Sequence, residues 1–267
     1  MTRSPLAPSR ATRWTIGILV GAVFAVPFAA TLLFTLTAAD GSLTLDRWTA
    51  LFDPARAAAY VPVWAGLVNS LVLAVVTVAI VLVVLAPTMV LVALRYPALR
   101  RVFEFFALLP ITIPAIVLVV GLAPIYLAIG RTFGTGTWSL AFAYGIVVLP
   151  FAYRSIQASI DAVDLRTLAE AARTLGASWP AVLIRVIAPN LRQGLLAASL
   201  MTVAVVLGEF TIASLLNRQV LQTGLVLVNK QDAWASAIFT LLALAFAFVL
   251  LLIIGRAGRV GAGRKTS

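Results

Sequence analysis

Residues 161–192 read DAVDLRTLAEAARTLGASWPAVLIRVIAPNLR and form a long polar interruption between two apolar segments. The first half predicts a helix, because its apolar residues recur at helical spacing and form one stripe: Leu165, Leu168, Ala169, Ala172 and Leu175. Asp164 is placed to cap this helix, and Gly176 is placed to end it in a left-handed turn.

The second half of the stretch predicts another helix. Ser178 is a candidate cap, and Pro180 falls in the first turn, where a missing N–H is tolerated. The apolar face of this helix comprises Val182, Leu183, Val186 and Ile187. We therefore expect a short helix–turn–helix at a membrane surface.

The composition of the whole chain explains why a membrane is expected. The chain has 267 residues, of which 62% are hydrophobic and 11% are charged, and its mean hydropathy is +1.07. A soluble domain could not bury so much apolar surface, so the sequence predicts an all-α polytopic membrane protein. Cysteine and histidine are both absent. Their absence excludes disulfides, thiolate and imidazole metal sites, and catalysis by a Ser–His pair.

The sequence predicts six membrane spans, at about 14–39, 65–94, 105–128, 138–152, 193–216 and 233–254. We expect the third to be bent or interrupted, because it contains Pro110, Pro114 and Pro124. Residues 217–232 are expected to form a polar loop. The basic residues before the first segment also fit a signal peptide, but this segment is too long for one, so an uncleaved helix is expected.

The distribution of basic residues orients these spans. On one side, the loops hold Arg47, Arg56, Arg131, Arg218 and Lys230. All other Lys and Arg residues lie near the two termini, in the turn 95–101 or in 154–192, on the opposite side. The positive-inside rule therefore predicts that both termini and 154–192 are cytoplasmic. This orientation accounts for the net charge of +11, so nucleic-acid binding is not expected.

One spacing within 161–192 resembles a known signature. Glu170-Ala171-Ala172 is followed by three residues, Gly176, nine residues and then Val186-Ile187-Ala188-Pro189. This pattern resembles the EAA loop of ABC-importer permeases, which reads E-A-A, three residues, G, nine residues, I, one residue, L-P. Val186 and Ala188 depart from that pattern by changes from one apolar residue to another.

The resemblance extends over about 65–256 and implies the permease subunit of a type I ABC importer in the inner membrane. It implies a coupling surface for a cytoplasmic ATPase that comprises Glu170, Ala171, Ala172, Leu175, Gly176 and Ala177. It also implies a second permease subunit and an extracytoplasmic solute-binding protein. No cofactor and no catalytic site are expected in this chain, because the partner hydrolyses ATP.

The same interpretation divides the chain into three parts. Residues 1–64 comprise a cytoplasmic tail, the first span and a periplasmic loop, residues 65–256 form the permease core, and residues 257–267 form a basic cytoplasmic tail. Glu209 is the ionisable residue that the sequence places deep inside a span, where a carboxylate is costly unless it faces a partner or an aqueous path. Two interpretations stay open: a pathway residue that meets a cationic substrate or a gating partner, and a structural hydrogen bond or a contact with a partner permease.

Residues 207–216 (LGEFTIASLL) are most similar to the polyamine branch of these permeases, which adjoins the ferric-iron, thiamine and phosphonate branches. Spermidine or putrescine is therefore the favoured substrate. The alternative from another class is a self-sufficient channel or secondary transporter. That class would call for an internal repeat or several intramembrane charges, and the sequence shows no clear repeat and one such charge.

Overall fold

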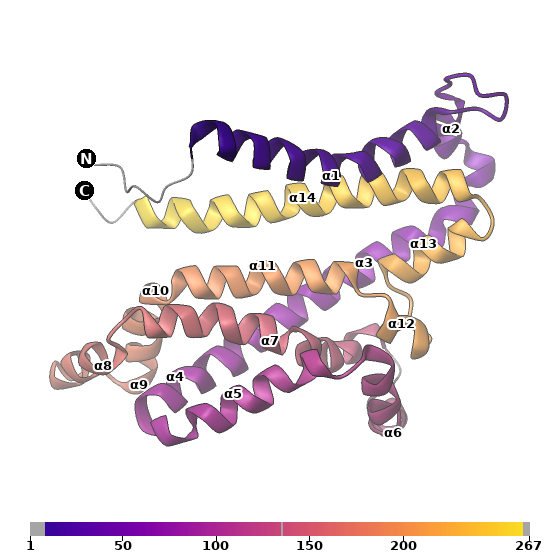
Figure 1. Cartoon of the computed structure of the whole chain (residues 1–267). Coiled ribbons are helices and arrows are strands. Elements are labelled where there is room, and N and C mark those ends of the chain that lie inside the picture. Colours follow the sequence, from indigo (N-terminus) through magenta and orange to yellow (C-terminus); the bar gives the residue numbers. More distant parts are fainter. Residues whose placement is uncertain (1–8, 135, 264–267) are drawn as a thin grey trace. The chain divides into compact units, whose positions relative to one another are not determined.

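The computed structural model describes residues 9–134 and 136–263, which fold almost entirely into helices (Figure 1). The bridge pairing found among them is a single antiparallel bridge between Thr37 and Leu43. Contacts divide the chain into two units. The first comprises Met1–Tyr60 and Val226–Ala245, and the second comprises Val61–Leu225 and Phe246–Ser267. Each unit is described by itself.

Within the described residues, five helical segments are long and apolar enough to cross a membrane: Arg10–Leu36, Pro54–Arg95, Ala115–Thr132, Thr137–Asp161 and Ala233–Arg256. A sixth span results if Trp179–Asn190 and Arg192–Gly208, which meet at an angle of 79°, are counted together. The prediction of an all-α polytopic membrane protein is therefore confirmed.

The first unit contains α1 (Arg10–Leu36), α2 (Asp46–Thr49), the short 3-10 turns η1 (Ala50–Phe52) and η2 (Pro54–Arg56), and the beginning of α14 (Ala233–Gly263). Trp234 of α14 contacts α1 and α2. The Arg47 guanidinium lies 3.7 Å from its ring centroid, and the Phe34 ring stacks on it with the centroids 5.9 Å apart. Trp48 Nε1 also donates a hydrogen bond to Thr35 Oγ1 at 3.2 Å. Most of α1 is exposed, as expected for an apolar helix that faces lipid or another subunit.

The second unit begins inside one long helical run, made of α3 (Ala57–Ile80), the π-helical turn η3 (Val81–Leu85) and α4 (Ala86–Arg95). After the 3-10 turn η4 (Pro97–Leu99) come α5 (Arg100–Leu108), the 3-10 turn η5 (Leu109–Thr112) and α6 (Ala115–Phe133). The predicted third span is interrupted as expected, but its bounds were wrong. Ile113 and Pro114 have extended backbone, since a proline disfavours helical geometry in the residue before it, and the spanning helix starts at Ala115.

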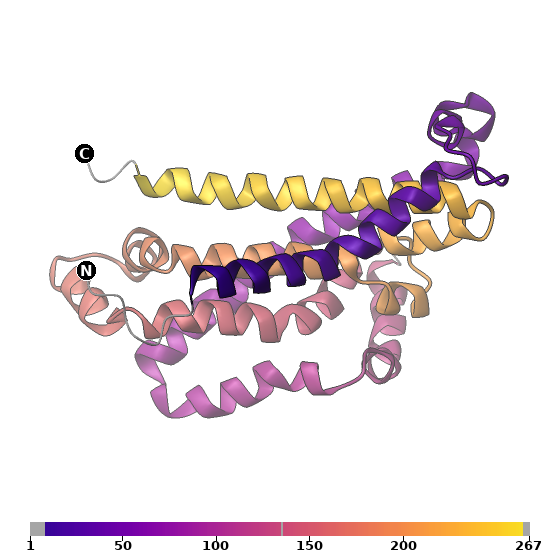
Figure 2. The ribbon, with the colours of Figure 1, turned by 45° about the horizontal axis from the view of Figure 1, so that its top comes forward.

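The 3-10 turn η6 (Thr137–Ser139) leads into α7 (Leu140–Asp161). This helix and α11 (Arg192–Gly208) form the centre of the second unit and lie side by side in both ribbon views (Figures 1 and 2). Gly194 allows this close approach, because a Cβ there would lie 2.5 Å from Ser159 Oγ and 2.6 Å from the carbonyl oxygen of Ser155. Small residues are used in this way wherever membrane helices must touch. α7 continues nine residues beyond the predicted end of the fourth span, to Asp161.

The segment after α11 corrects two predictions. The predicted fifth span 193–216 is wrong at its end, because α11 stops at Gly208, and α12 (Thr211–Leu215) is a separate helix. The predicted loop 217–232 contains another helix, α13 (Leu221–Asn229). Asn217 has a positive φ of 51° and turns the chain between the two. Apolar residues lie on both sides of Gly208-Glu209, which is why the sequence was interpreted as one continuous span.

Candidate functional site

The candidate site is a helical hairpin built from α8 (Leu165–Thr174), a turn, and a second helical run over 179–190. The predicted cap at Asp164 is present: its carboxylate accepts from the Thr167 hydroxyl at 2.7 Å and from the Thr167 N–H at 3.2 Å. These two hydrogen bonds hold the pKa of Asp164 below its ordinary value. The capping contribution is therefore present at neutral pH and is lost as the pH falls through that lowered pKa.

The turn between the two helices depends on Gly176. Its φ is +83°, the left-handed geometry that the sequence predicted, and the Gly176 N–H donates to the carbonyl of Arg173 at 3.0 Å. The Ala177 N–H donates to the carbonyl of Ala172 at 3.1 Å, so these two carbonyls at the end of α8 are satisfied. Arg173 closes the turn from outside, because its Nη1 donates to the carbonyl of Ala177 at 2.7 Å.

The second helical run consists of α9 (Trp179–Ala181), the π-helical segment η7 (Val182–Ile187) and α10 (Ala188–Asn190). Ser178 occupies the cap position, but its side chain accepts no capping hydrogen bond, so that part of the prediction was wrong. Of the predicted apolar face, Val182 and Ile187 are buried, and Leu183 and Val186 are partly buried.

The inner side of the hairpin is locked into the helix bundle. Leu165 and Ala169 of α8 are buried in one apolar cluster together with Val182 and Ile187. The same cluster includes residues of η3, α4, α7 and α11: Val81, Leu85, Met89, Val90, Ile156, Ile160 and Ala198 among them. Because protein interiors are close-packed, a displacement of the hairpin is passed on to these helices.

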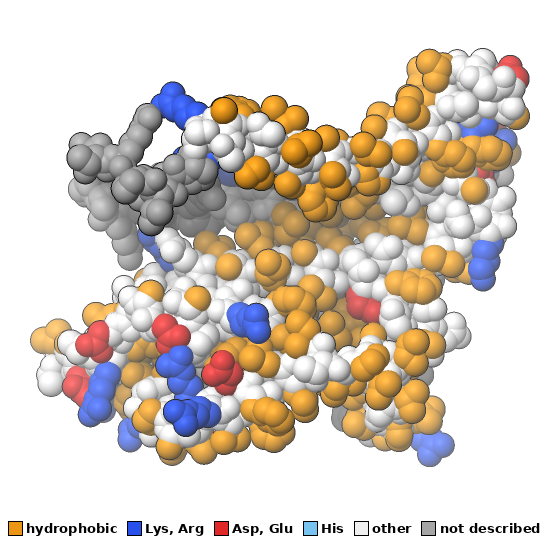
Figure 3. All heavy atoms as spheres, in the orientation of Figure 1, with side chains coloured by type: hydrophobic (Ala, Val, Ile, Leu, Met, Phe, Trp, Pro, Cys, Tyr) orange, Lys and Arg blue, Asp and Glu red, His pale blue; other side chains and the backbone are white. Residues whose placement is uncertain are grey.

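The outer side of the hairpin is free and partly apolar. Leu175 does not continue the predicted buried stripe: its side chain is 88% exposed, because the stripe ends where the helix gives way to the turn. Glu170, Ala171 and Gly176 are also exposed, whereas Ala172 and Ala177 are half-buried. Figure 3 shows acidic and basic side chains gathered at this end of the second unit. On this side Arg166 Nε lies 2.8 Å from Glu170 Oε1, and this ion pair is largely exposed and contributes little to stability.

Glu209 does not lie inside a helix, which corrects the prediction for this residue. It sits at the break after α11 with extended backbone, and its carboxylate accepts from the N–H groups of Ile212 at 2.8 Å and Ala213 at 3.3 Å. These are free donors at the start of α12, so the carboxylate caps that helix. The structural hydrogen bond that the sequence left open is thus present, and it does not exclude a second role for the charge.

Three residues outside the predicted set, Arg95, Arg173 and Trp179, meet at the hairpin. Arg95, the last residue of α4, and Arg173 of α8 both place their guanidinium carbons 5.5 Å from the ring centroid of Trp179. Contacts of this kind are cation–π interactions. Arg95 was missed because it was interpreted only as part of a basic turn. Trp179 could have been singled out as a bulky aromatic residue directly after a turn of small residues, Gly176-Ala177-Ser178.

Comparison with known proteins identifies the family to which the chain belongs. Residues 89–259 match the family described as binding-protein-dependent transport system inner membrane component. A probable ABC transporter permease protein of Sinorhizobium fredii is similar to this chain, with 27% identity over 273 residues that cover 95% of the chain and 47% of that protein. The chain thus spans about half the length of the curated relative that it matches. The chain belongs to the family of binding-protein-dependent transport system inner membrane components, whose members are non-catalytic membrane subunits.

Proposed function

We propose that this permease subunit imports a small solute that an extracytoplasmic binding protein delivers, and that ATPase subunits drive it by binding the α8–α9 hairpin. The observation that supports the proposal is that one side of the hairpin is buried and the other is exposed. Its inner side is locked into the bundle through Leu165 and Ala169, while Leu175 stands 88% exposed on the outer side. A large apolar side chain exposed on a polar tip favours a protein partner.

The proposed docking surface comprises Glu170, Ala171, Ala172, Leu175, Gly176 and Ala177. The small residues leave room for a partner to approach the backbone, and Leu175 supplies an apolar anchor. Closure of the ATPase subunits on ATP would move this surface, and the buried side of α8 would pass the movement to α4 and α7. Family membership also removes the support for the alternative of a self-sufficient channel or secondary transporter.

The orientation of the proposed complex follows from charge. The hairpin holds Arg166, Arg173 and Arg185, and the positive-inside rule assigns such a segment and both termini to the cytoplasm. We further propose that a second permease subunit packs against α1. This helix is exposed along most of its length, and a Cβ at Gly17 or Gly21 would meet no atom within 4 Å. Small residues four positions apart favour such helix contacts.

A polyamine remains the proposed substrate, with Glu209 as a proposed contact for its positive charge. Glu209→Gln separates this role from capping, because an amide oxygen can still accept a hydrogen bond from the start of α12. We expect Glu209→Gln to reduce uptake of labelled spermidine while the amount of folded protein stays at the wild-type level. Glu209→Ala should also lower the thermal stability, since a lost cap costs about 1 kcal/mol. Wild-type spermidine uptake by Glu209→Gln would exclude the substrate role.

Assembly with an ATPase tests the proposed function directly. The full chain should co-purify with the ABC ATPase of its own transport system when the two are expressed together, and it should not hydrolyse ATP when purified alone. The measurement is an affinity pull-down followed by an ATP hydrolysis assay on both preparations. A chain that hydrolyses ATP alone, or that never retains the ATPase, would contradict the proposal.

A further inference from the structure

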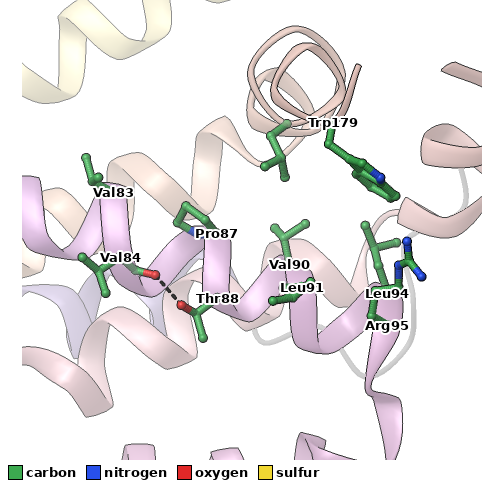
Figure 4. A pocket seen from close by; sticks show the side chains of 10 residues that line it. Val83, Val84, Pro87, Thr88, Val90, Leu91, Leu94, Arg95 and Trp179 are labelled. Carbon is green, nitrogen blue, oxygen red and sulfur yellow. Dashed lines mark hydrogen bonds between the residues drawn. The ribbon is translucent and has the colours of Figure 1, made fainter. Parts of the chain in front are cut away.

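An apolar groove runs along α4 beside the second helix of the hairpin (Figure 4). The cavity has a volume of about 470 Å³, and its walls include Val83, Pro87 and Leu91 on one side and Leu183 on the other. The Thr88 hydroxyl in its wall donates to the carbonyl of Val84 at 2.7 Å, so it offers no free donor to a ligand. The groove is therefore suited to a hydrocarbon chain rather than to a polar solute.

A second cavity of about 440 Å³ continues the groove and is basic. It shares Leu94, Arg95 and Trp179 with the groove, and it adds Arg166, Arg173 and Glu170. Glu170 already forms an ion pair with Arg166, with Oε1 and Nε 2.8 Å apart. Arg95 and Arg173 form no ion pair with any described residue, so two positive charges in this cavity have no counter-charge within the part of the chain that the structure describes.

Trp179 lines both cavities, and the two charges lie around its ring. The guanidinium carbons of Arg95 and Arg173 are each 5.5 Å from its ring centroid. Two like charges that share one ring repel each other, and an anion bound between them would relieve the repulsion. Arginine is also well suited to phosphate, because its planar group donates two parallel hydrogen bonds.

We propose that one anionic phospholipid binds here, with an acyl chain in the groove and its phosphate at Arg95 and Arg173. The location supports a lipid rather than a soluble anion, because Arg95 is the last residue of the apolar segment Pro54–Arg95 and the groove follows that segment back. A tryptophan at the boundary between apolar and polar surroundings is typical of the lipid headgroup region. Basic pockets between membrane helices bind anionic headgroups for the same electrostatic reason.

Native mass spectrometry of the purified full chain tests this proposal without any ATPase. The chain is mixed with equal amounts of phosphatidylglycerol and phosphatidylcholine that carry identical acyl chains. We expect one phosphatidylglycerol to be retained in preference to phosphatidylcholine. Arg95→Gln and Arg173→Gln should each lower this retention about fivefold, the effect of one surface charge near a lipid. Arg101→Gln is the matched control, since Arg101 is also exposed and lines neither cavity.

The groove and the headgroup are tested separately. Leu91→Trp should fill the groove and reduce retention, whereas Val75→Trp, on an exposed part of α3 outside the cavity, should not. Free glycerol 3-phosphate should fail to displace the lipid. Displacement by glycerol 3-phosphate would indicate a site for a soluble anion. Unchanged retention in both arginine variants would overturn the proposal, and if these variants lost ATPase binding instead, the arginines would belong to the docking surface.

Discussion

Replacement of Gly66 or Gly224 by leucine should leave almost no folded permease. The two glycines make reciprocal contacts between α3 and the segment 218–225. A Cβ at Gly66 would overlap the carbonyl oxygen of Val220, and a Cβ at Gly224 would overlap that of Pro62. These are backbone atoms, so no side-chain rotation relieves the overlap, and we expect a cost of roughly 3 kcal/mol or more. Hydrogen bonds between the same segments, such as Asn69 Nδ2 to the carbonyl of Gln219 at 2.8 Å, would be lost with it.

The measurement is the yield of monodisperse protein in detergent together with its unfolding temperature. Gly121→Leu is the matched control, because this glycine also lies in an apolar helix and a Cβ there would meet no atom within 4 Å. The control should retain the wild-type yield and unfolding temperature. A stable Gly66→Leu protein would show that α3 and the segment 218–225 do not approach as closely as described.

Gly176→Asp should abolish coupled ATP hydrolysis while the chain still inserts and folds. The φ of +83° at this position costs a non-glycine residue roughly 1–2 kcal/mol. There is open space around the position, so the aspartate would not collide within the chain. It would instead place a charge in the middle of the proposed docking surface, where an unpaired buried charge is strongly unfavourable. Binding of the ATPase and hydrolysis stimulated by the binding protein should therefore fall together.

Gly41→Asp is a matched control for this variant. Gly41 has a φ of +84° and equally open surroundings, but it lies in the turn after α1, outside the hairpin. Both variants place an aspartate at a position of similar positive φ, and only Gly176→Asp should fail in an ATPase pull-down that is normalised to membrane-inserted protein. Gly176→Ala should show an intermediate loss. Equal ATPase binding by Gly176→Asp and wild-type protein would remove the hairpin from the proposed interface.

The sequence predicted the features that depend on local chemistry. The helical class follows from long apolar segments, the Asp164 cap from a short polar side chain before a helix, and the left-handed turn from Gly176. Each of these depends on a few neighbouring residues. The third span was expected to be interrupted for the same reason, since prolines act on their own turn of backbone.

The features that the sequence did not predict depend on contacts between distant residues. The end of α11 at Gly208 lies within a segment that was predicted as one span, and the free N–H groups at the start of α12 are satisfied by Glu209. Leu175 fits the periodic stripe, but no packed neighbour lies beyond the end of α8 to bury it. The meeting of Arg95, Trp179 and Arg173 joins two segments far apart in the chain, which no spacing rule could indicate.

Because η7 is π-helical, the number of residues between Gly176 and Pro189 determines how the hairpin is rotated about the helix axis. A π-helical turn holds one residue more than an α-helical turn, so it acts as a single-residue insertion that the helix has absorbed. Deletion of one residue within Val182–Ile187 would return the segment to α-helical phase and rotate everything before it by about 100°. Trp179 and the hairpin would then point in another direction relative to α11. The nine-residue spacer after Gly176 thus determines the direction of the hairpin relative to α11 as well as its distance from α11.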